Sequence, residues 1–205
     1  MKKSKSDIKF KGLEKKSIRN LIIAELITRK SKSFIDFWGN GEMYAMCKKA
    51  KIPIFSIDNG KDFISLPKER EALKAKLNNH KDRAYISFKQ LCKQKRKDDA
   101  FWLDYCGALG QTVWKDLERI PVIMTDKGVL FITYQEGHEV GFPKGTDRRL
   151  INRYYGDATE EILEHGGIKV KKFLSYRYMS YPDYGSRRKL GGTPMVTIGY
   201  NWKKI

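Results

Sequence analysis

Short apolar runs alternate with longer amphipathic segments along the first two thirds of the chain, and this alternation limits the possible folds most strongly. Short apolar runs are typical of buried strands, whereas apolar residues at three- to four-residue spacing are typical of helices. The expected strands are residues 34–38, 53–57, 84–88, 100–103 and 128–134, and the expected helices are residues 13–27, 42–50, 67–77 and 112–120. Strands that alternate with helices pair in parallel through right-handed crossovers, so the sequence predicts an α/β fold.

The alternation stops after residue 134. A helix is expected over residues 147–165, and it ends at the pair Gly166 and Gly167. Two long strands are expected next, at residues 168–179 and 195–202, with no helical segment between them. Consecutive strands without a crossover helix pair antiparallel. We therefore expect these two strands to form an antiparallel pair at one edge of the sheet.

Positive charge is concentrated at the two ends of this 205-residue chain, whose formal net charge is +18. Residues 1–32 contain eleven lysines and arginines against three acids, and residues 169–205 contain nine against one acid. Clustered positive charge attracts polyanions because binding releases counterions, so a nucleic acid, RNA or DNA, is the expected partner. We divide the chain into a basic N-terminal segment with a helix, residues 1–32, and a main domain, residues 33–205.

Cysteine and histidine usage predicts neither a disulfide framework nor a metal centre. The cysteines are odd in number and the histidines are scattered, and neither set has metal-ligand spacing. These residues are Cys47, Cys92, Cys106, His80, His138 and His165. No apolar stretch approaches the roughly 18 residues of a membrane span. We therefore expect a cytoplasmic protein in a reducing compartment, with no metal and no membrane contact.

Three acids are expected at the carboxyl ends of strands, where ligands bind in an open α/β sheet. Asp36 lies in the first run and is followed by Gly39 and Gly41, whose lack of a Cβ lets a ligand approach the backbone. Asp58 closes the second run, where a carboxylate can accept hydrogen bonds from both hydroxyls of a ribose. Asp104 ends the fourth run and can position an amine or hydroxyl, or take its proton.

Each of these features also has a purely structural interpretation. The glycine pair is compatible with a tight turn, and Asp104 is compatible with a cap on the following helix. Tyr105 can stack on a flat acceptor such as a base, or it can pack in the core. The functional interpretation is favoured because acids recur at successive strand ends, where this architecture places its chemistry.

The order of these segments resembles the class I S-adenosylmethionine-dependent methyltransferases. The similarity rests on FIDFWGNG, IPIFSID, FWLDYCG and GVLFITYQ, followed by two closing strands, and it extends over residues 34–202. It implies a doubly wound, seven-stranded and mostly parallel sheet with an antiparallel C-terminal strand. It also implies S-adenosylmethionine as the cofactor.

The resemblance assigns roles in cofactor binding to individual residues. Asp58 matches the acid that holds the ribose, and Asn59 stands beside the adenine. Ser87 or Phe88 takes the position after the third strand where many members have an acid that contacts the adenine. The first cofactor loop, which faces the methionine part, consists of Asp36, Phe37, Trp38, Gly39, Asn40 and Gly41. The bulky Trp38 departs from the small residues usual in that loop.

The resemblance implies that the acceptor is bound beside Asp104 and Tyr105, which are the expected catalytic residues. The motif differs from the Asn/Asp-Pro-Pro-Tyr of amino-group methylation, so the acceptor atom stays open. In one alternative, cytosine-C5 chemistry, the Cys106 thiolate attacks the ring and Glu136 holds the edge of the base. A buried structural thiol is the simpler interpretation of Cys106.

Further basic residues are candidates for nucleic-acid contacts because arginines pair with phosphates and can stack on bases. They are Arg148, Arg149 and Arg153 in one helix and Arg187, Arg188 and Lys189 in the loop over residues 181–192. We expect a methyltransferase for nucleic acid, with RNA slightly favoured because no separate sequence-reading domain is evident. The alternatives are a nucleic-acid-binding protein that has lost catalysis, and a methyltransferase for proteins or small molecules.

Overall fold

Strands from the whole length of the chain form one sheet with the order β3-β2-β1-β4-β5-β7-β6. This computed structural model describes residues 11–38, 41–58, 67–78, 81–94, 96–105, 110–136, 142–143, 145–180 and 193–205. The strands are β1 (Phe34–Phe37), β2 (Ile54–Ile57), β3 (Arg83–Ala84), β4 (Asp98–Asp104), β5 (Met124–Gln135), β6 (Ile168–Ser180) and β7 (Thr193–Lys204). Strands β3, β2, β1, β4 and β5 pair in parallel, whereas β7 runs antiparallel to both β5 and β6.

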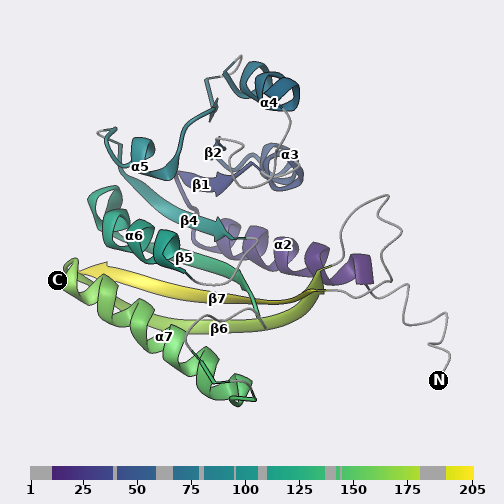
Figure 1. Cartoon of the computed structure of the whole chain (residues 1–205). Coiled ribbons are helices and arrows are strands. Elements are labelled where there is room, and N and C mark those ends of the chain that lie inside the picture. The colour runs from purple at the N-terminus through teal and green to yellow at the C-terminus, as the bar shows by residue number, and fades with distance from the viewer. Residues whose placement is uncertain are drawn as a thin grey trace, which may run out of the picture.

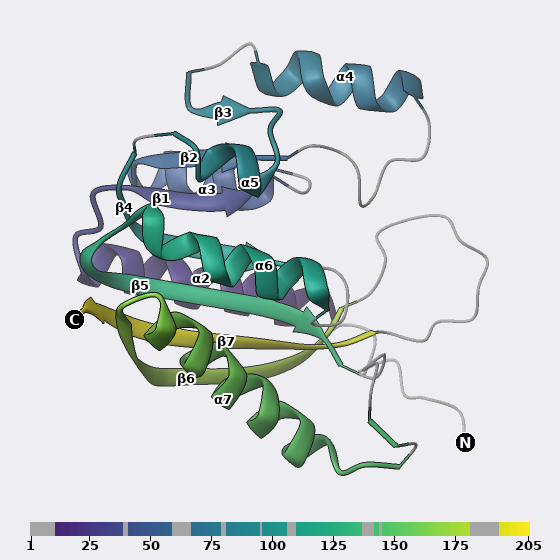
Figure 2. The ribbon, with the colours of Figure 1, turned by 60° about the vertical axis from the view of Figure 1, so that its left-hand side comes forward.

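Helices cover both faces of this sheet (Figure 1 and Figure 2). They are α2 (Lys11–Thr28), α3 (Glu42–Lys49), α4 (Pro67–Asn78), α5 (Phe88–Leu91), α6 (Gln111–Arg119) and α7 (Arg148–His165), with a short 3-10 turn, η1 (Ile120–Val122). Helices α2 and α3 pack on one face, and α5, α6 and α7 pack on the other. The central strands are thus buried on both faces, which explains their nearly continuous apolar sequences.

The N-terminal helix α2 contributes directly to the hydrophobic core. Ile18, Ile22 and Leu26 recur every four residues along one side of α2, and each is at most 1% exposed. They share one buried cluster with Phe34 of β1 and Trp102 of β4. Burying each aliphatic side chain stabilises the fold by about 1.5–3 kcal/mol. The helix expected within residues 1–32 is therefore packed against the sheet formed by the rest of the chain.

The predicted fold class is confirmed, but one local prediction is wrong. Of the strand expected over residues 84–88, only Ala84 lies in a strand, as the second residue of β3, and α5 begins at Phe88. Ser87 is the N-cap of α5: its Oγ accepts from the Gln90 backbone N–H at 3.3 Å, and its own backbone N–H donates to Gln90 Oε1 at 2.8 Å. This reciprocal capping box starts a helix. The chain therefore enters a helix here, although the apolar run favours a strand.

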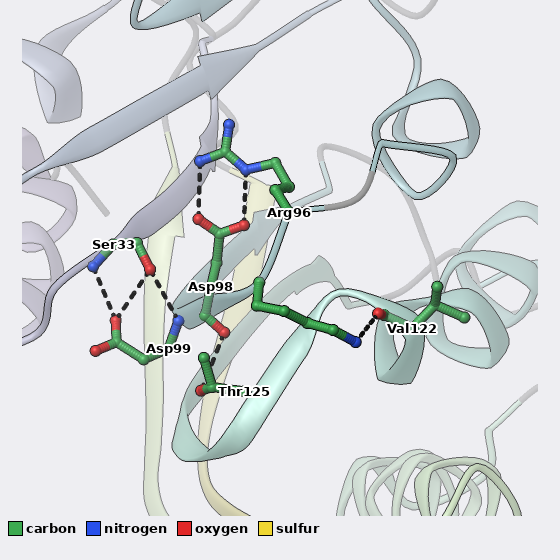
Figure 3. Close-up of polar contacts among 7 residues, drawn as sticks. Ser33, Arg96, Asp98, Asp99, Val122 and Thr125 are labelled. Atoms are coloured by element: carbon green, nitrogen blue, oxygen red, sulfur yellow. Dashed lines mark hydrogen bonds and ion pairs between the residues drawn. The ribbon is translucent and has the colours of Figure 1, made fainter.

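Charged side chains join the amino ends of the central strands (Figure 3). Asp98 is 1% exposed, and its two carboxylate oxygens accept hydrogen bonds from two nitrogens of Arg96, each at 2.8 Å. The neighbouring Asp99 accepts from the backbone N–H groups of Lys32 at 2.8 Å and Ser33 at 3.0 Å. These bonds tie the start of β1 to the start of β4, at the edge opposite the carboxyl ends.

Replacing Arg96 by methionine is expected to lower the free energy of unfolding by about 3 kcal/mol. Methionine retains an apolar stem but leaves the buried carboxylate of Asp98 without its bidentate partner. Urea denaturation followed by circular dichroism measures the loss. The control Lys115→Met, at an exposed position on α6, should change stability by less than about 0.5 kcal/mol. Equal losses in the two variants would contradict the role assigned to Arg96.

Candidate functional site

Asp36 and Asp104 extend from adjacent parallel strands toward the same face of the sheet. Asp36 pairs in register with Trp102, and Asp104 lies two residues further along β4, at its carboxyl end. Side chains two residues apart on a strand point to the same face, and here this is the face covered by α2 and α3. The structure therefore brings together two of the acids that the sequence singled out.

Asp36 is a buried carboxyl group with an unused acceptor. It is 1% exposed, and the hydroxyl of Ser56 on β2 donates to its Oδ1. Its Oδ2 is buried and has no hydrogen-bond partner among the described residues. Burial raises the pKa of Asp36 to about 8; the charge of Asp104 adds to the rise, and the Ser56 bond and Arg19 oppose it. The site thus contains a carboxyl group that titrates near neutral pH.

Asp104 is paired with a lysine from the N-terminal helix. Lys15 Nζ lies 3.7 Å from Asp104 Oδ2, while Asp104 Oδ1 is buried without a hydrogen-bond partner in the described ranges. Burial raises the pKa of Asp104 above its usual value, and the positive charges of Lys15 and Arg19 partly offset that rise. Asp104 is therefore positioned at the strand end with one oxygen free to accept a hydrogen bond.

Lys15 and Arg19 are site residues that the sequence analysis missed. They lie four residues apart on α2, and Arg19 forms an ion pair with Glu42 at the start of α3. The available signal was their spacing, because residues at i and i+4 share one side of a helix. That spacing does not reveal which strand end the helix crosses, so the partner acids were not predictable.

The side chain of Trp38 fills the space beside Gly41. Trp38 is only 6% exposed, and its ring packs against Tyr44, with the Arg83 guanidinium 4.8 Å from each ring centroid. Gly41 has a φ of 80°, and an added Cβ would lie 2.7 Å from Trp38 Cζ2. This packing accounts for Gly41 without a ligand, and the expected contact of the loop with a cofactor stays a prediction.

Aromatic residues near the same strand ends face the opposite side of the sheet. Phe37 packs edge-on against Tyr105 at 5.3 Å and against Phe88 at 6.1 Å between ring centroids. The Tyr105 hydroxyl donates to Asp116 of α6 at 3.2 Å. The sheet thus separates the predicted site residues into two groups, because Phe37, Phe88 and Tyr105 lie on the face opposite Asp36 and Asp104.

Two further cofactor candidates have defined places in the structure. Asp58 directly follows β2, is half-buried, and donates its backbone N–H to the carbonyl of Ala84 at 3.2 Å. Ser87 uses its side chain in the cap of α5. Both residues lie beyond the carboxyl ends of neighbouring strands, as a ligand site in this architecture requires.

Glu136 is engaged by two protein side chains. It directly follows β5, and its carboxylate oxygens accept from Asn152 Nδ2 at 2.6 Å and from Arg177 Nε at 2.5 Å. Asn152 in turn accepts from the Tyr134 hydroxyl at 3.0 Å. This network connects β5, β6 and α7, so both oxygens of the Glu136 carboxylate already have protein partners.

Comparison with known proteins identifies the fold. No protein-family model and no curated protein matches the sequence. Among solved structures, M. jannaschii TYW2 in complex with AdoMet matches 100% of this chain and 79% of its own, with a TM-score of 0.52 and 15% identity. A candidate RNA methyltransferase from Pyrococcus horikoshii matches 92% of this chain and 85% of its own, with a TM-score of 0.54 and 13% identity.

A third similar structure is that of an enzyme named for a small-molecule substrate. It is the Burkholderia thailandensis 1,6-didemethyltoxoflavin-N1-methyltransferase, solved with 1,6-didemethyltoxoflavin and S-adenosylhomocysteine. It matches 91% of this chain and 77% of its own, with a TM-score of 0.52 and 15% identity. This chain has the class I methyltransferase fold. At these identities, the likeness extends to the fold and not to the substrate.

The remaining predicted residues divide between the surface and the undescribed parts of this methyltransferase fold. Arg148, Arg149 and Arg153 are exposed on the first two turns of α7. The others lie outside the described residues: Gly39, Asn40, Asn59, Cys106, Arg187, Arg188 and Lys189. The described residues contain no cluster of three potential metal ligands, and none of the described helices combines the length and apolar character needed to cross a membrane.

Proposed function

We propose that this protein is an S-adenosylmethionine-dependent methyltransferase that acts on nucleic acid. The observation that carries the proposal is the pair Asp36 and Asp104. Each places a buried acceptor oxygen, without a hydrogen-bond partner among the described residues, at the carboxyl ends of adjacent strands. Buried polar groups are normally satisfied, and acceptors left open at the ligand edge of an α/β sheet suggest a binding site. The class I methyltransferase fold supports the type of chemistry.

The residues present fit the proposed cofactor. S-adenosylmethionine carries positive charge on its sulfonium and ammonium groups, and carboxylates favour a cation placed beside them. Asp36 would face the charged methionine part of the cofactor, whose positive charge would favour the ionised form of its carboxyl group. Asp58, at the end of the neighbouring strand, would accept hydrogen bonds from the ribose hydroxyls. When bound, the cofactor supplies an electrophilic methyl group.

Asp104 would orient the acceptor group. An N–H or O–H of the acceptor can donate to the free Oδ1 of Asp104, which directs the acceptor lone pair and prepares for loss of its proton. Lys15 favours the ionised carboxylate that this role needs. Tyr105, next in the chain, would flank the acceptor from the other side of the sheet edge. Because the transfer is a direct displacement, we expect positioning to supply most of the rate enhancement.

Nucleic acid is the proposed substrate class because of charge. A net charge of +18 concentrated at the chain ends favours a polyanion, and the exposed arginines of α7 add positive charge to the main domain. The likeness to a candidate RNA methyltransferase is consistent with RNA.

A methyl transfer assay with radiolabelled cofactor tests the choice of substrate class. The panel contains structured RNA, single-stranded DNA, duplex DNA, protein extract and small molecules. Label confined to protein or small molecules would overturn it.

Replacing Asp58 by alanine is expected to weaken S-adenosylmethionine binding by about 10- to 100-fold, the loss typical of hydrogen bonds to a charged group. Isothermal titration calorimetry of the purified variant measures the affinity directly. The control Asp126→Ala removes an exposed acid from the amino-terminal part of β5, and it should bind the cofactor like the original protein. Unchanged binding by Asp58→Ala would overturn the cofactor assignment. Binding by neither protein would favour a nucleic-acid-binding protein without catalysis.

A further inference from the structure

Helix α7 carries its positive and negative charges on different halves. Three arginines lie within its first six residues, Arg148, Arg149 and Arg153, whereas its acids follow in the second half. These acids are Asp157, Glu160, Glu161 and Glu164. Before them, the one acid at the start of the helix, Asp147, uses its side chain to cap the helix by accepting from the Arg149 backbone N–H at 2.8 Å. The first two turns of α7 are therefore strongly basic.

The basic half of α7 lies at the same edge of the sheet as the candidate site. The chain leaves β5 at its carboxyl end, passes along α7, and enters β6, which runs in the same direction as β5 because both are antiparallel to β7. Helix α7 must therefore run back from the carboxyl edge to the amino edge, as Figure 2 shows. Its arginines lie at the edge where Asp104 ends β4, and its acids lie toward the opposite edge.

Two apolar side chains are exposed among these arginines. Leu150 is 58% exposed and Tyr154 is 56% exposed, and their spacing of four residues puts them on one side of the helix. Arg149 and Arg153 form a second row with the same spacing, directly beside the first. None of the three arginines of this half forms an ion pair with a described residue. We call this surface, Arg148, Arg149, Leu150, Arg153 and Tyr154, the α7 basic face.

The ring of Tyr154 is held in place despite its exposure. It packs edge-to-face against Phe142 at 5.3 Å and against Tyr155 at 5.9 Å between centroids. Tyr155 is itself 3% exposed and packs on Tyr134 of β5. A positioned aromatic ring loses little conformational freedom when a flat group stacks on it, which is how such rings contribute to binding bases.

We propose that the α7 basic face binds a single-stranded segment of the nucleic-acid substrate, at the same edge of the sheet as Asp104. Arg149 and Arg153 contact phosphates, and Tyr154 stacks on an unpaired base. A duplex would satisfy the arginines through its backbone but would leave Tyr154 and Leu150 without a partner, because its base faces are already stacked. This inference rests on the proposed function, since it assumes that the substrate is a nucleic acid.

Equilibrium binding measurements test the stacking role of Tyr154. The full chain is titrated against fluorescent 15-nucleotide RNA and DNA single strands and against the corresponding duplexes. Tyr154→Ala is expected to raise the Kd for single strands by about 5- to 100-fold, whereas Tyr154→Phe, which keeps the ring, should bind within about twofold of the original protein. Duplex binding should be insensitive to both changes. Thermal unfolding of each variant checks that the fold is retained.

Salt dependence tests the phosphate contacts independently. The double variant Arg149→Gln/Arg153→Gln is expected to reduce the slope of log Kd against log salt by about 1.4 for single strands. Lys68→Gln/Lys74→Gln removes the same charge from exposed positions on α4 and should leave the slope nearly unchanged. Equal reductions in both double variants would overturn the assignment of Arg149 and Arg153.

The outcomes separate this inference from the proposed function. Tight single-strand binding that is unaffected by Tyr154→Ala would overturn the α7 basic face and leave the methyltransferase proposal intact. Binding to none of the nucleic acids would overturn both the face and nucleic acid as the substrate class. Methyl transfer to protein or small molecules, compared between the original protein and Asp104→Asn, would then still report whether the catalytic assignment holds.

Discussion

Replacing Asp104 by asparagine is expected to reduce methyl transfer by about 10²- to 10⁴-fold, the usual contribution of a positioned acid-base group. The amide has nearly the same shape as the carboxylate, yet it cannot take a proton or hold the acceptor through a charged hydrogen bond. Cofactor binding should be largely retained, because Asp58 and Asp36 are unchanged. Single-turnover transfer with labelled cofactor, on whichever polymer is accepted, measures the loss.

The same substitution is expected to stabilise the protein. Burial raises the pKa of Asp104, so the folded state tolerates its charge poorly, and the neutral amide avoids this cost. Gain of stability with loss of activity is typical of a residue retained for function. The control Asp126→Asn, an exposed acid, should change neither quantity. An Asp104→Asn protein that transfers methyl groups at the original rate would contradict the catalytic assignment.

The stability of the cofactor-free protein is expected to depend on pH through Asp36. Its pKa is near 3.8 for an ordinary aspartate and about 8 in the fold, so the folded state keeps a proton that the unfolded chain releases. The stabilising contribution is complete below about pH 4 and is lost as the pH rises to about 8. The slope reaches at most about 1.4 kcal/mol per pH unit, the limit for the release of a single proton.

Comparison with Asp36→Asn isolates this contribution. The variant has no titrating group at position 36, so the original protein should lose free energy of unfolding relative to it between pH 4 and pH 8. Urea denaturation at five pH values gives the difference. Asp126→Asn, which removes an exposed acid, is the matched control. A constant difference for Asp36→Asn would show that Asp36 is ionised throughout and would remove it as the titrating group.

Local sequence patterns predicted most of the fold. Apolar runs and helical periodicity predicted the elements, and their alternation predicted the parallel sheet, because both depend on residues close together in the chain. The misassigned strand over residues 84–88 had a local signal too, since Ser87 and Gln90 have the spacing of a capping box. This helix-capping signal outweighs the apolar run, so the start of α5 is encoded locally in the sequence.

The candidate site was predictable only in part. Asp36, Asp58 and Asp104 could be assigned to strand ends from the sequence, because topology places the ends of parallel strands at one edge. Their environments could not be assigned in this way. The burial that raises the pKa of Asp36 comes from strands and helices far apart in the chain. No local sequence pattern predicts how deeply such a residue is buried.

The sequence by itself thus determined the α/β class, the strand-end acids and the concentration of basic charge, all of which follow from residue type and short-range spacing. The tertiary structure decided which of these groups meet. It set Lys15 of α2 against Asp104 of β4, assigned Asp36 and Tyr105 to opposite faces of the sheet, and directed the arginines of α7 to the carboxyl edge. These relations depend on strand register and helix packing, which are fixed by contacts between distant segments.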